Sequence, residues 1–206
     1  MQVTIDGKKL AAFAKAFTPQ KPGVRYYLIG VNFEFLPCGR INMVATDGGI
    51  LGAEKLETPC DNPPSIDTQF IVPAAALKAL KGIVTLTFTP SDDTAKPGTV
   101  TIASGATSTT CALVAGKFPD YRRVMRPANT GPGFAQWYDP ELLSRAADYF
   151  KANKAKSPGV MYYNHPEADW GSLLFGHSSV PFFTGIVRPV RVVEKGLDTF
   201  PGMQTF

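Results

Sequence analysis

The chain has 206 residues, of which 44% are hydrophobic and 18% are charged, and this composition excludes a disordered polymer. Its net charge of +4 is compatible with a polyanionic partner but is too small to require one. The three cysteines have no paired spacing, and the sequence has neither an apolar leader nor a long apolar run. We therefore expect reduced thiols, a cytoplasmic location, no signal peptide and no membrane span.

The expected elements form three copies of one unit, in which a strand leads into a helix and then into several alternating strands. The first copy has a strand at 1–6, a helix at 7–17 and strands within 25–36 and 41–57. The second has a strand at 68–72, a helix at 73–82 and strands at 83–90, 98–104 and 107–115. The third has a strand at 133–139, a helix at 140–156 and strands at 159–165, 170–177 and 181–193.

This pattern predicts an α+β fold dominated by antiparallel sheet, with one helix in each repeat. Asp6 is a suitable N-cap for the first helix, and Gly82 is expected to end the second one. We divide the chain into a domain of two repeats at 1–127, a third repeat or half domain at 128–192, and a tail at 193–206. The segments 99–104 and 181–187 are candidate sheet edges.

All three helices carry basic side chains outside their apolar stripes and few acids. Each helix alone is compatible with an ordinary solvated face, whereas the three together favour a surface that lies near phosphate backbones. The candidate DNA-facing residues are Lys8, Lys9, Lys15, Lys78, Lys81, Arg145, Lys151 and Lys154.

Several motifs together resemble one family, the bacterial sliding clamp, which is the beta subunit of DNA polymerase III. They are VRYYLIGVNFEF at 24–35, VATDGGILGAEK at 44–55, FIVPAAALKAL at 70–80, GKFPDYRRVMRP at 116–127 and GIVRPVRV at 185–192. The resemblance is specific over 1–127, weaker over 128–192 and absent over 193–206. It implies the DNA-clamp fold in a shortened and divergent member, of a size that would suit a phage or mobile element.

The resemblance also implies partners and a site. Clamps encircle double-stranded DNA without sequence specificity, with the helices toward the DNA, and bind peptides of the polymerase or clamp loader in an outer pocket. Carried over by motif, the pocket residues are Leu28, Thr46, Gly48, Leu51, Pro119, Arg123, Val124, Pro189 and Val190. Gly49 and Ile50 stand where the family usually has histidine and arginine, and Arg188 and Val190 stand where methionines are common.

Bracing is the alternative role for Tyr121 and the two arginines that follow it, which would then hold the link between the second and third copies. On the fragment alone this role is favoured, and with the other two motifs present the pocket is favoured.

The length of the chain leaves two functions open. Three repeats make one and a half clamp domains, so a closed ring would take several chains, and a homotetramer is one arithmetic solution. The alternative is an interaction module that keeps the clamp fold without forming a ring and competes for clamp-binding partners. The tail segment GLDTF at 196–200 resembles a clamp-binding peptide, so Leu197 and Phe200 are candidates for docking into the pocket. The alternative, which the segment alone favours, is a disordered chain end with two incidental apolar residues.

No catalytic constellation occurs, so we expect a non-enzymatic accessory protein without a cofactor. His165 and His177, with Glu167 and Asp169 near the first, match no zinc spacing, and no metal site is expected. The glycine-containing segments TDGG and ASGAT match neither a P-loop nor a dinucleotide-binding fingerprint.

Overall fold

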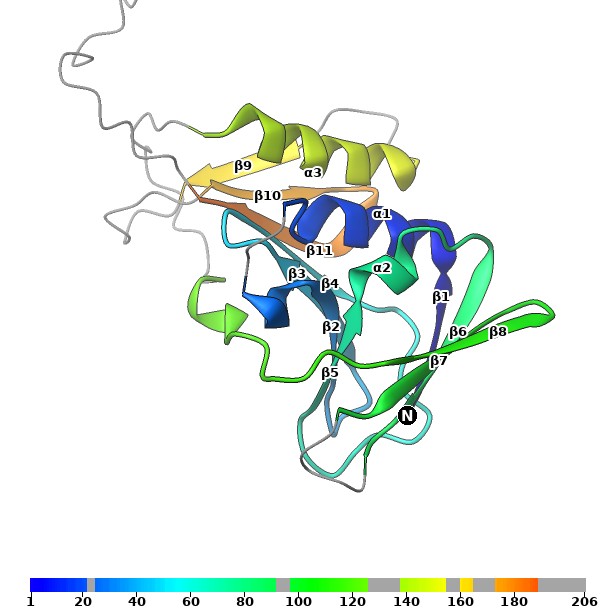
Figure 1. The fold of residues 1–206 in the computed structure, drawn as a ribbon. Coiled ribbons are helices and arrows are strands. Elements are labelled where there is room, and N and C mark those ends of the chain that lie inside the picture. Colours follow the sequence, from blue (N-terminus) through cyan, green and yellow to red (C-terminus); the bar gives the residue numbers. More distant parts are fainter. Residues whose placement is uncertain (22–24, 92–96, 126–137, 155–159, 165–172, 189–206) are drawn as a thin grey trace, which may run out of the picture.

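A computed structural model describes residues 1–21, 25–91, 97–125, 138–154, 160–164 and 173–188, which form two antiparallel sheets with helices beside them (Figure 1). The four-stranded sheet has the order β1 (Gln2–Asp6), β6 (Ile83–Thr89), β7 (Thr99–Ser104), β8 (Thr107–Ala112). The seven-stranded sheet has the order β5 (Thr68–Pro73), β2 (Gly30–Phe35), β3 (Ile41–Thr46), β4 (Ile50–Lys55), β11 (Val180–Val187), β10 (Leu173–His177), β9 (Val160–Asn164). The helices are α1 (Gly7–Phe17), α2 (Ala74–Leu77) and α3 (Pro140–Ala152), and two 3-10 turns are η1 (Tyr26–Leu28) and η2 (Tyr121–Arg123). The α+β fold class is confirmed.

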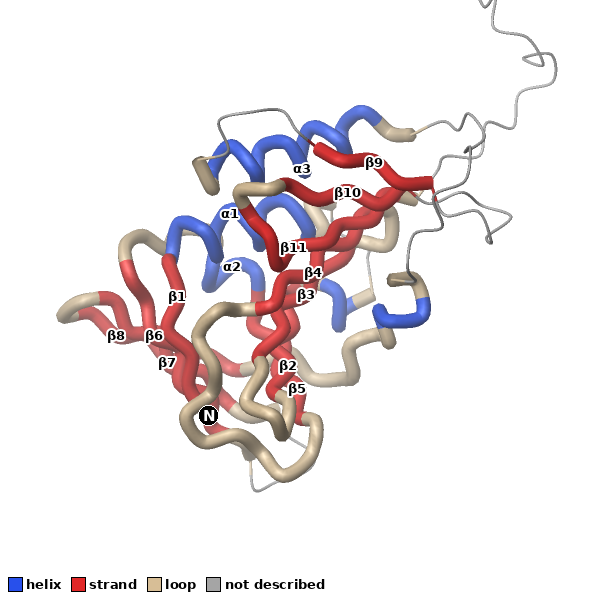
Figure 2. The backbone as a smooth tube through the Cα atoms, turned by 180° about the vertical axis from the view of Figure 1, so that it is seen from behind, coloured by secondary structure: helices blue, strands red, loops and turns tan. Residues whose placement is uncertain are grey.

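The first two copies exchange their opening strands. Strand β1 pairs with β6 of the second copy, and β5 pairs with β2 of the first copy. The described strands of the third copy extend the sheet of the first copy, because β11 pairs with β4 from Phe183↔Glu54 to Val187↔Ile50. Figure 2 shows the resulting continuous sheet from behind, with β9 and β10 beyond β11.

Helix α1 has the expected bounds, and Asp6 caps it by accepting a hydrogen bond from the backbone N–H of Lys8 at 2.8 Å. The expectation for the second helix was wrong in length, since α2 is a single turn that ends at Leu77. Gly82 instead has a φ of 65° in the turn before β6, where its carbonyl accepts from the N–H of Gly7 at 2.6 Å. Helix α3 ends at Ala152, four residues before its expected end.

The candidate edges were also wrong. Strand β7 lies between β6 and β8, and β11 lies between β4 and β10. Among the described strands, β1, β8, β5 and β9 form the edges. Strand β8 is exposed at five of its six positions and consists mainly of threonine and serine, which suits an edge that faces water.

The main core joins both sheets to the helices, with α1 and α3 side by side on one face of the seven-stranded sheet (Figures 1 and 2). The ring of Phe13 lies 5.5 Å from that of Tyr149, and Phe17 lies 5.4 Å from Phe183, measured between centroids. These rings join α1 of the first copy to α3 and β11 of the third. Gly52 leaves room for Phe17, since a Cβ there would approach that ring to 2.7 Å, and its cross-strand partner Gly185 leaves room for Phe175.

Candidate functional site

A second, smaller hydrophobic cluster lies on the opposite face of the seven-stranded sheet. It contains two of the expected pocket residues, Leu28 of η1 and Leu51 of β4, with side chains from the segment 118–121 above them. Leu51 pairs with Ile186, so the first and third copies meet in this cluster. We call it the outer cluster, and its buried members are Leu28, Val44, Leu51, Ala53, Ile71, Phe118, Tyr121, Leu174 and Ile186.

The segment that carries Phe118 and Tyr121 is held to the sheet by Glu34 of β2. Both Glu34 oxygens accept from Arg122, at 2.8 and 2.6 Å, and one also accepts from the hydroxyl of Tyr121 at 2.8 Å. Asn42 donates to the same carboxylate at 2.8 Å. Glu34 is only 1% exposed, so these donors compensate a charge that water does not reach.

Protonation of this network follows from the same contacts. Burial acts to raise the pKa of the Glu34 carboxyl, but the hydrogen bonds from Arg122, Asn42 and Tyr121 and the charge of Arg122 outweigh it and lower the pKa. Burial, together with the hydrogen bond and charge of Glu34, raises the pKa of the Tyr121 hydroxyl. At neutral pH the network therefore consists of an ionised carboxylate with neutral and cationic donors.

Bracing by Tyr121 and Arg122 leaves the neighbouring residues on the surface. Pro119, Arg123 and Val124 are exposed, and Val124 is 53% exposed although it is apolar. Tyr26 in η1 and Ile29 directly after it are likewise exposed, at 60% and 47%. Exposed apolar side chains thus occur in or next to η1 and η2, the two segments that contribute Leu28 and Tyr121 to the outer cluster.

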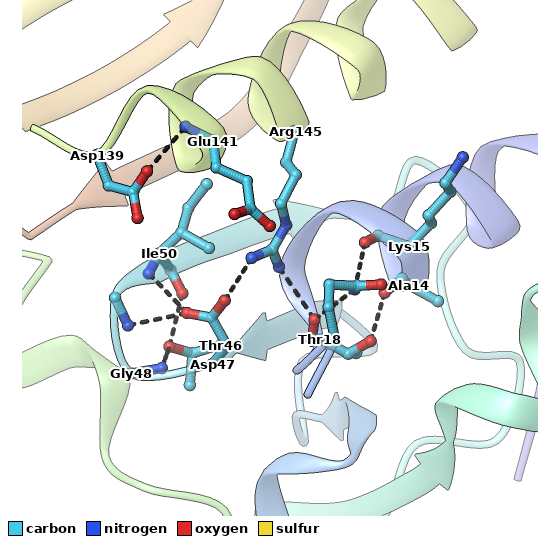
Figure 3. Close-up of polar contacts among 12 residues, drawn as sticks. Ala14, Lys15, Thr18, Thr46, Asp47, Gly48, Ile50, Asp139, Glu141 and Arg145 are labelled. Atoms are coloured by element: carbon cyan, nitrogen blue, oxygen red, sulfur yellow. Dashed lines mark hydrogen bonds and ion pairs between the residues drawn. The ribbon is translucent and has the colours of Figure 1, made fainter. Parts of the chain in front are cut away.

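The turn between β3 and β4 holds Thr46 and Gly48, two further expected pocket residues (Figure 3). The Thr46 hydroxyl donates to the carbonyl of Ile50 at 2.7 Å and accepts from the N–H of Gly48 at 3.1 Å. Gly48 has a φ of 94°, which a residue with a side chain adopts only under strain, and no atom lies within 4 Å of where its Cβ would be. The backbone conformation, not crowding, requires glycine at this exposed turn.

Two of the expected DNA-facing residues are engaged inside the fold. Arg145 is paired with Asp47 at 2.5 Å, and its side chain is 14% exposed. Lys9 is paired with the buried Glu54, which also accepts from the hydroxyl of Tyr149. Burial, with the charge and hydrogen bond of Glu54, raises the pKa of the Tyr149 hydroxyl. The charges of Lys9 and Arg145 therefore stabilise the packing of α1 and α3 on the sheet.

The remaining expected DNA-facing residues are exposed. Lys8 and Lys15 lie on α1, and Lys78 and Lys81 follow α2. On the third copy, Lys151 pairs with Asp148 at 3.4 Å, and Lys154 lies beyond the helix end with a φ of 59°. A cavity of about 560 Å³ between α1 and α3 is lined by Lys15 and Arg145 but also by Glu141 and Asp148. Exposed lysines thus occur on all three copies, and acids are interspersed with them between α1 and α3.

Some expected residues fall outside the described part of the chain: Pro189, Val190, Leu197, Phe200, His165, Glu167 and Asp169. His177 is buried, packs with its ring centroid 5.3 Å from that of Phe150, and accepts from the N–H of Ser179 at 3.0 Å. Within the described residues, no cluster of three or more potential ligands could hold a metal ion. No helix among them has the length and apolarity needed to span a bilayer.

Sequence reasoning missed part of the floor of the outer cluster, namely Val44, Ile71, Leu174 and Ile186. The signal for these residues is the alternation of each strand, but it does not show which strands become neighbours. The role of Glu34 was missed for the same reason, because its partner Arg122 is 88 positions away.

Solved structures with this arrangement are sliding clamps. The clamp of Pseudomonas aeruginosa, solved with a ligand, is 19% identical with a TM-score of 0.62 over 93% of this chain and 66% of that one. The beta subunit of Borrelia burgdorferi, in complex with a natural product, is 14% identical with a TM-score of 0.66, over 93% and 64%. The clamp of Bartonella birtlesii bound to griselimycin is 15% identical with a TM-score of 0.61, over 93% and 66%. This chain thus has the sliding-clamp fold and spans about two thirds of the length of those clamps.

The family follows from the sequence itself. The family model "DNA polymerase III beta subunit, central domain" matches residues 4–120, which is more than half of the chain. The chain therefore belongs to the DNA polymerase III beta subunit family, as its motifs indicated. The family consists of non-catalytic accessory subunits, which supports the expectation that the protein is not an enzyme. No curated protein sequence matches the chain.

Proposed function

We propose that this protein is a sliding-clamp-like processivity factor of DNA replication that acts in the cytoplasm as a homo-oligomer. It approaches double-stranded DNA with its helices and binds a peptide of a polymerase or clamp loader on the outer face. The outer cluster is the observation that carries the proposal. It joins η1, the start of β4, the segment 118–125 and β11 in one place, although they lie far apart in the sequence.

The peptide pocket of the proposal combines an apolar floor with exposed rim residues. Leu28 and Leu51 supply the floor, and Val124 supplies an exposed apolar wall. Arg123 is exposed and offers a guanidinium to an acidic side chain or a peptide carbonyl. Thr46, Gly48 and Pro119 complete the rim, and Pro189 and Val190 belong to the proposal by motif alone. An apolar anchor with a few polar contacts is the usual chemistry of such sites.

The DNA side of the proposal depends on exposed lysines. Lys8, Lys15, Lys78 and Lys81 lie on solvated faces, where phosphate contacts cost little desolvation. Lys151 and Lys154 are also exposed, but Lys151 is paired with Asp148 at 3.4 Å, so we assign Lys151 a smaller share. Such contacts are salt-sensitive and indifferent to sequence, as sliding requires.

Oligomeric mass and DNA retention test the proposal together. Light scattering at several protein concentrations and two salt levels should give a stable mass near four times the chain mass of 22.2 kDa. The protein should then remain on circular DNA and leave linear DNA. Replacing Lys8, Lys15 and Lys78 by glutamate should reduce retention, whereas the same charge change at Arg40, Lys55 and Lys117 should not. A persistent monomer that binds neither DNA form would overturn the ring.

The second candidate function is an interaction module that competes for clamp-binding partners without forming a ring. The mixed charge between α1 and α3 favours it, since Glu141 and Asp148 would repel phosphates there. A monomer that still binds a clamp-binding peptide would support this function. The probe is a labelled peptide carrying glutamine, leucine, aspartate, leucine and phenylalanine in that order.

The tail at 193–206 is part of the proposal because Leu197 and Phe200 resemble the anchors of such a peptide. Docking of the tail in the pocket would lower the apparent affinity for the labelled peptide. Deleting 193–206 should then tighten its binding. An unchanged dissociation constant would show that the tail does not occupy the pocket.

A further inference from the structure

One side chain of the third copy connects the β3–β4 turn to both inner helices (Figure 3). Arg145 of α3 donates from Nη1 to Oδ2 of Asp47 at 2.5 Å and from Nη2 to the carbonyl of Thr18 at 3.0 Å. Thr18 is the C-terminal cap of α1, and its carbonyl also accepts from Gln20 at 2.8 Å. Arg145 thus bridges segments that lie 98 and 127 positions away.

The bridge is shielded from water. The side chains of Arg145 and Asp47 are each 14% exposed, so solvent screens their attraction less than at an open surface. The planar guanidinium directs two of its donors at two fixed acceptors, a geometry that a lysine ammonium does not reproduce.

Asp47 transmits this constraint to the turn. Its Oδ1 accepts from the backbone N–H of Gly49 at 2.8 Å and of Ile50 at 2.9 Å, while Oδ2 binds Arg145. The carbonyl of Gly49 in turn accepts from the N–H of Arg188 after β11, at 2.8 Å. The turn is therefore fixed at two points by the third copy. Arg145 holds the side chain of Asp47, and the N–H of Arg188 holds the backbone carbonyl of Gly49.

We propose that Arg145 is a positioning residue for the peptide pocket, holding Thr46 and Gly48 at the rim in the conformation that receives a peptide. This inference rests on the proposed function and assigns a role to the half domain, whose helix α3 supports the outer site from the DNA side. Without Arg145, the Asp47 carboxylate loses this charged partner and rotates toward water, which releases the N–H groups of Gly49 and Ile50. The rim then becomes mobile although the apolar floor is intact.

The test compares Arg145→Leu, Arg145→Lys and Asp47→Asn with the control Arg40→Leu, which removes an exposed arginine far from the turn. The labelled peptide described above is titrated by fluorescence polarisation, and amide hydrogen exchange is measured at Gly49 and Ile50. We expect Arg145→Leu to weaken peptide binding by roughly tenfold, the value of one charged hydrogen bond. Exchange at both amides should accelerate, while the amide of Phe33 in β2 exchanges as in the wild type. Arg145→Lys should rescue part of both effects.

Each result decides the inference. Wild-type affinity within about twofold and unchanged exchange in folded Arg145→Leu would overturn the positioning role, as would faster exchange throughout the sheet, because that is loss of global stability. If Arg145→Leu does not fold, Asp47→Asn tests the positioning role instead. Its side chain keeps an acceptor for the amides of Gly49 and Ile50 but loses the negative charge that binds Arg145. Failure of the wild type to bind the peptide would overturn the proposed function instead, and the exchange rates would still decide whether Arg145 fixes the turn.

Discussion

Arg122 donates to both carboxylate oxygens of Glu34, at 2.8 and 2.6 Å, and so fixes the segment after β8 to strand β2 of the seven-stranded sheet. Its neighbour Arg123 faces solvent. The two adjacent arginines therefore have separate roles, one in the fold and one at the proposed pocket.

This separation predicts opposite effects of two alanine variants. Arg122→Ala should lower the free energy of unfolding by about 1–2 kcal/mol, because it leaves the buried Glu34 without its charged donor. The decrease is not larger because the Arg122 side chain is about half exposed, so solvent already screens the ion pair. Arg123→Ala should change stability by less than about 0.5 kcal/mol and weaken peptide binding several-fold. Urea unfolding and fluorescence polarisation measure the two effects. Loss of stability in Arg123→Ala alone would contradict the division.

The lowered pKa of Glu34 predicts a pH dependence. A carboxyl whose pKa is lower in the folded state stabilises the fold above its unfolded pKa, and this contribution is lost as the pH falls through the folded pKa. The stability difference between wild type and Glu34→Gln should be constant near neutral pH and shrink below the ordinary glutamate pKa of about 4.3. Urea unfolding over this range measures it. A difference that persists undiminished in acid would refute the ionised network.

Asn32 predicts a stabilising substitution. Its side chain is fully buried on β2 between Val44 and Ile71, and neither its oxygen nor its nitrogen is hydrogen-bonded within the described residues. Asn32→Leu has a similar size and removes the unpaired amide, so the free energy of unfolding should rise by about 1–2 kcal/mol. Thermal and urea unfolding measure this change. A decrease would show that the amide has a partner in solution.

Alanine substitutions at Gly185 and Gly176 are predicted to differ sharply in their effect on stability. A Cβ on Gly185 would lie 2.2 Å from Cζ of Phe175, whose ring is confined by Phe150 and Phe183 at 6.0 and 5.8 Å. Gly185→Ala should therefore cost about 1–3 kcal/mol through overpacking. Gly176→Ala on the paired strand is the control, since its Cβ would meet only a carbonyl at 3.4 Å. Equal stability of the two variants in urea would contradict the predicted clash.

The local parts of the fold could be predicted from the sequence. Helix α1 has the expected bounds because the Asp6 cap and the apolar stripe both lie within a few residues of one another. The helix expected at 73–82 was longer than α2, because the alanines and leucines after Pro73 favour a helix locally. The chain instead leaves the helix after Leu77 to bring Gly82 against Gly7.

The candidate site was predictable only in part. Leu28 and Leu51 lie in one cluster as the motifs implied. A helical projection places Lys9 and Arg145 outside the apolar stripe, but it does not show the acidic side chains that other elements bring into contact with them. Glu54 and Asp47, their partners, come from β4 and from the turn before it. Long-range ion pairs of this kind depend on the tertiary arrangement, not on local spacing.

The insertion of β11 between β4 and β10 has a consequence for synthesis. A ribosome makes β4 more than a hundred residues before its partner strand β11. The edge of β4 that pairs with β11 therefore stays without hydrogen-bond partners until β11 has emerged. Closure of the seven-stranded sheet is thus a late event with a large loop to close. During this interval β4 is a template on which a second nascent chain could dock, and a chaperone that shields it would raise the yield of native protein.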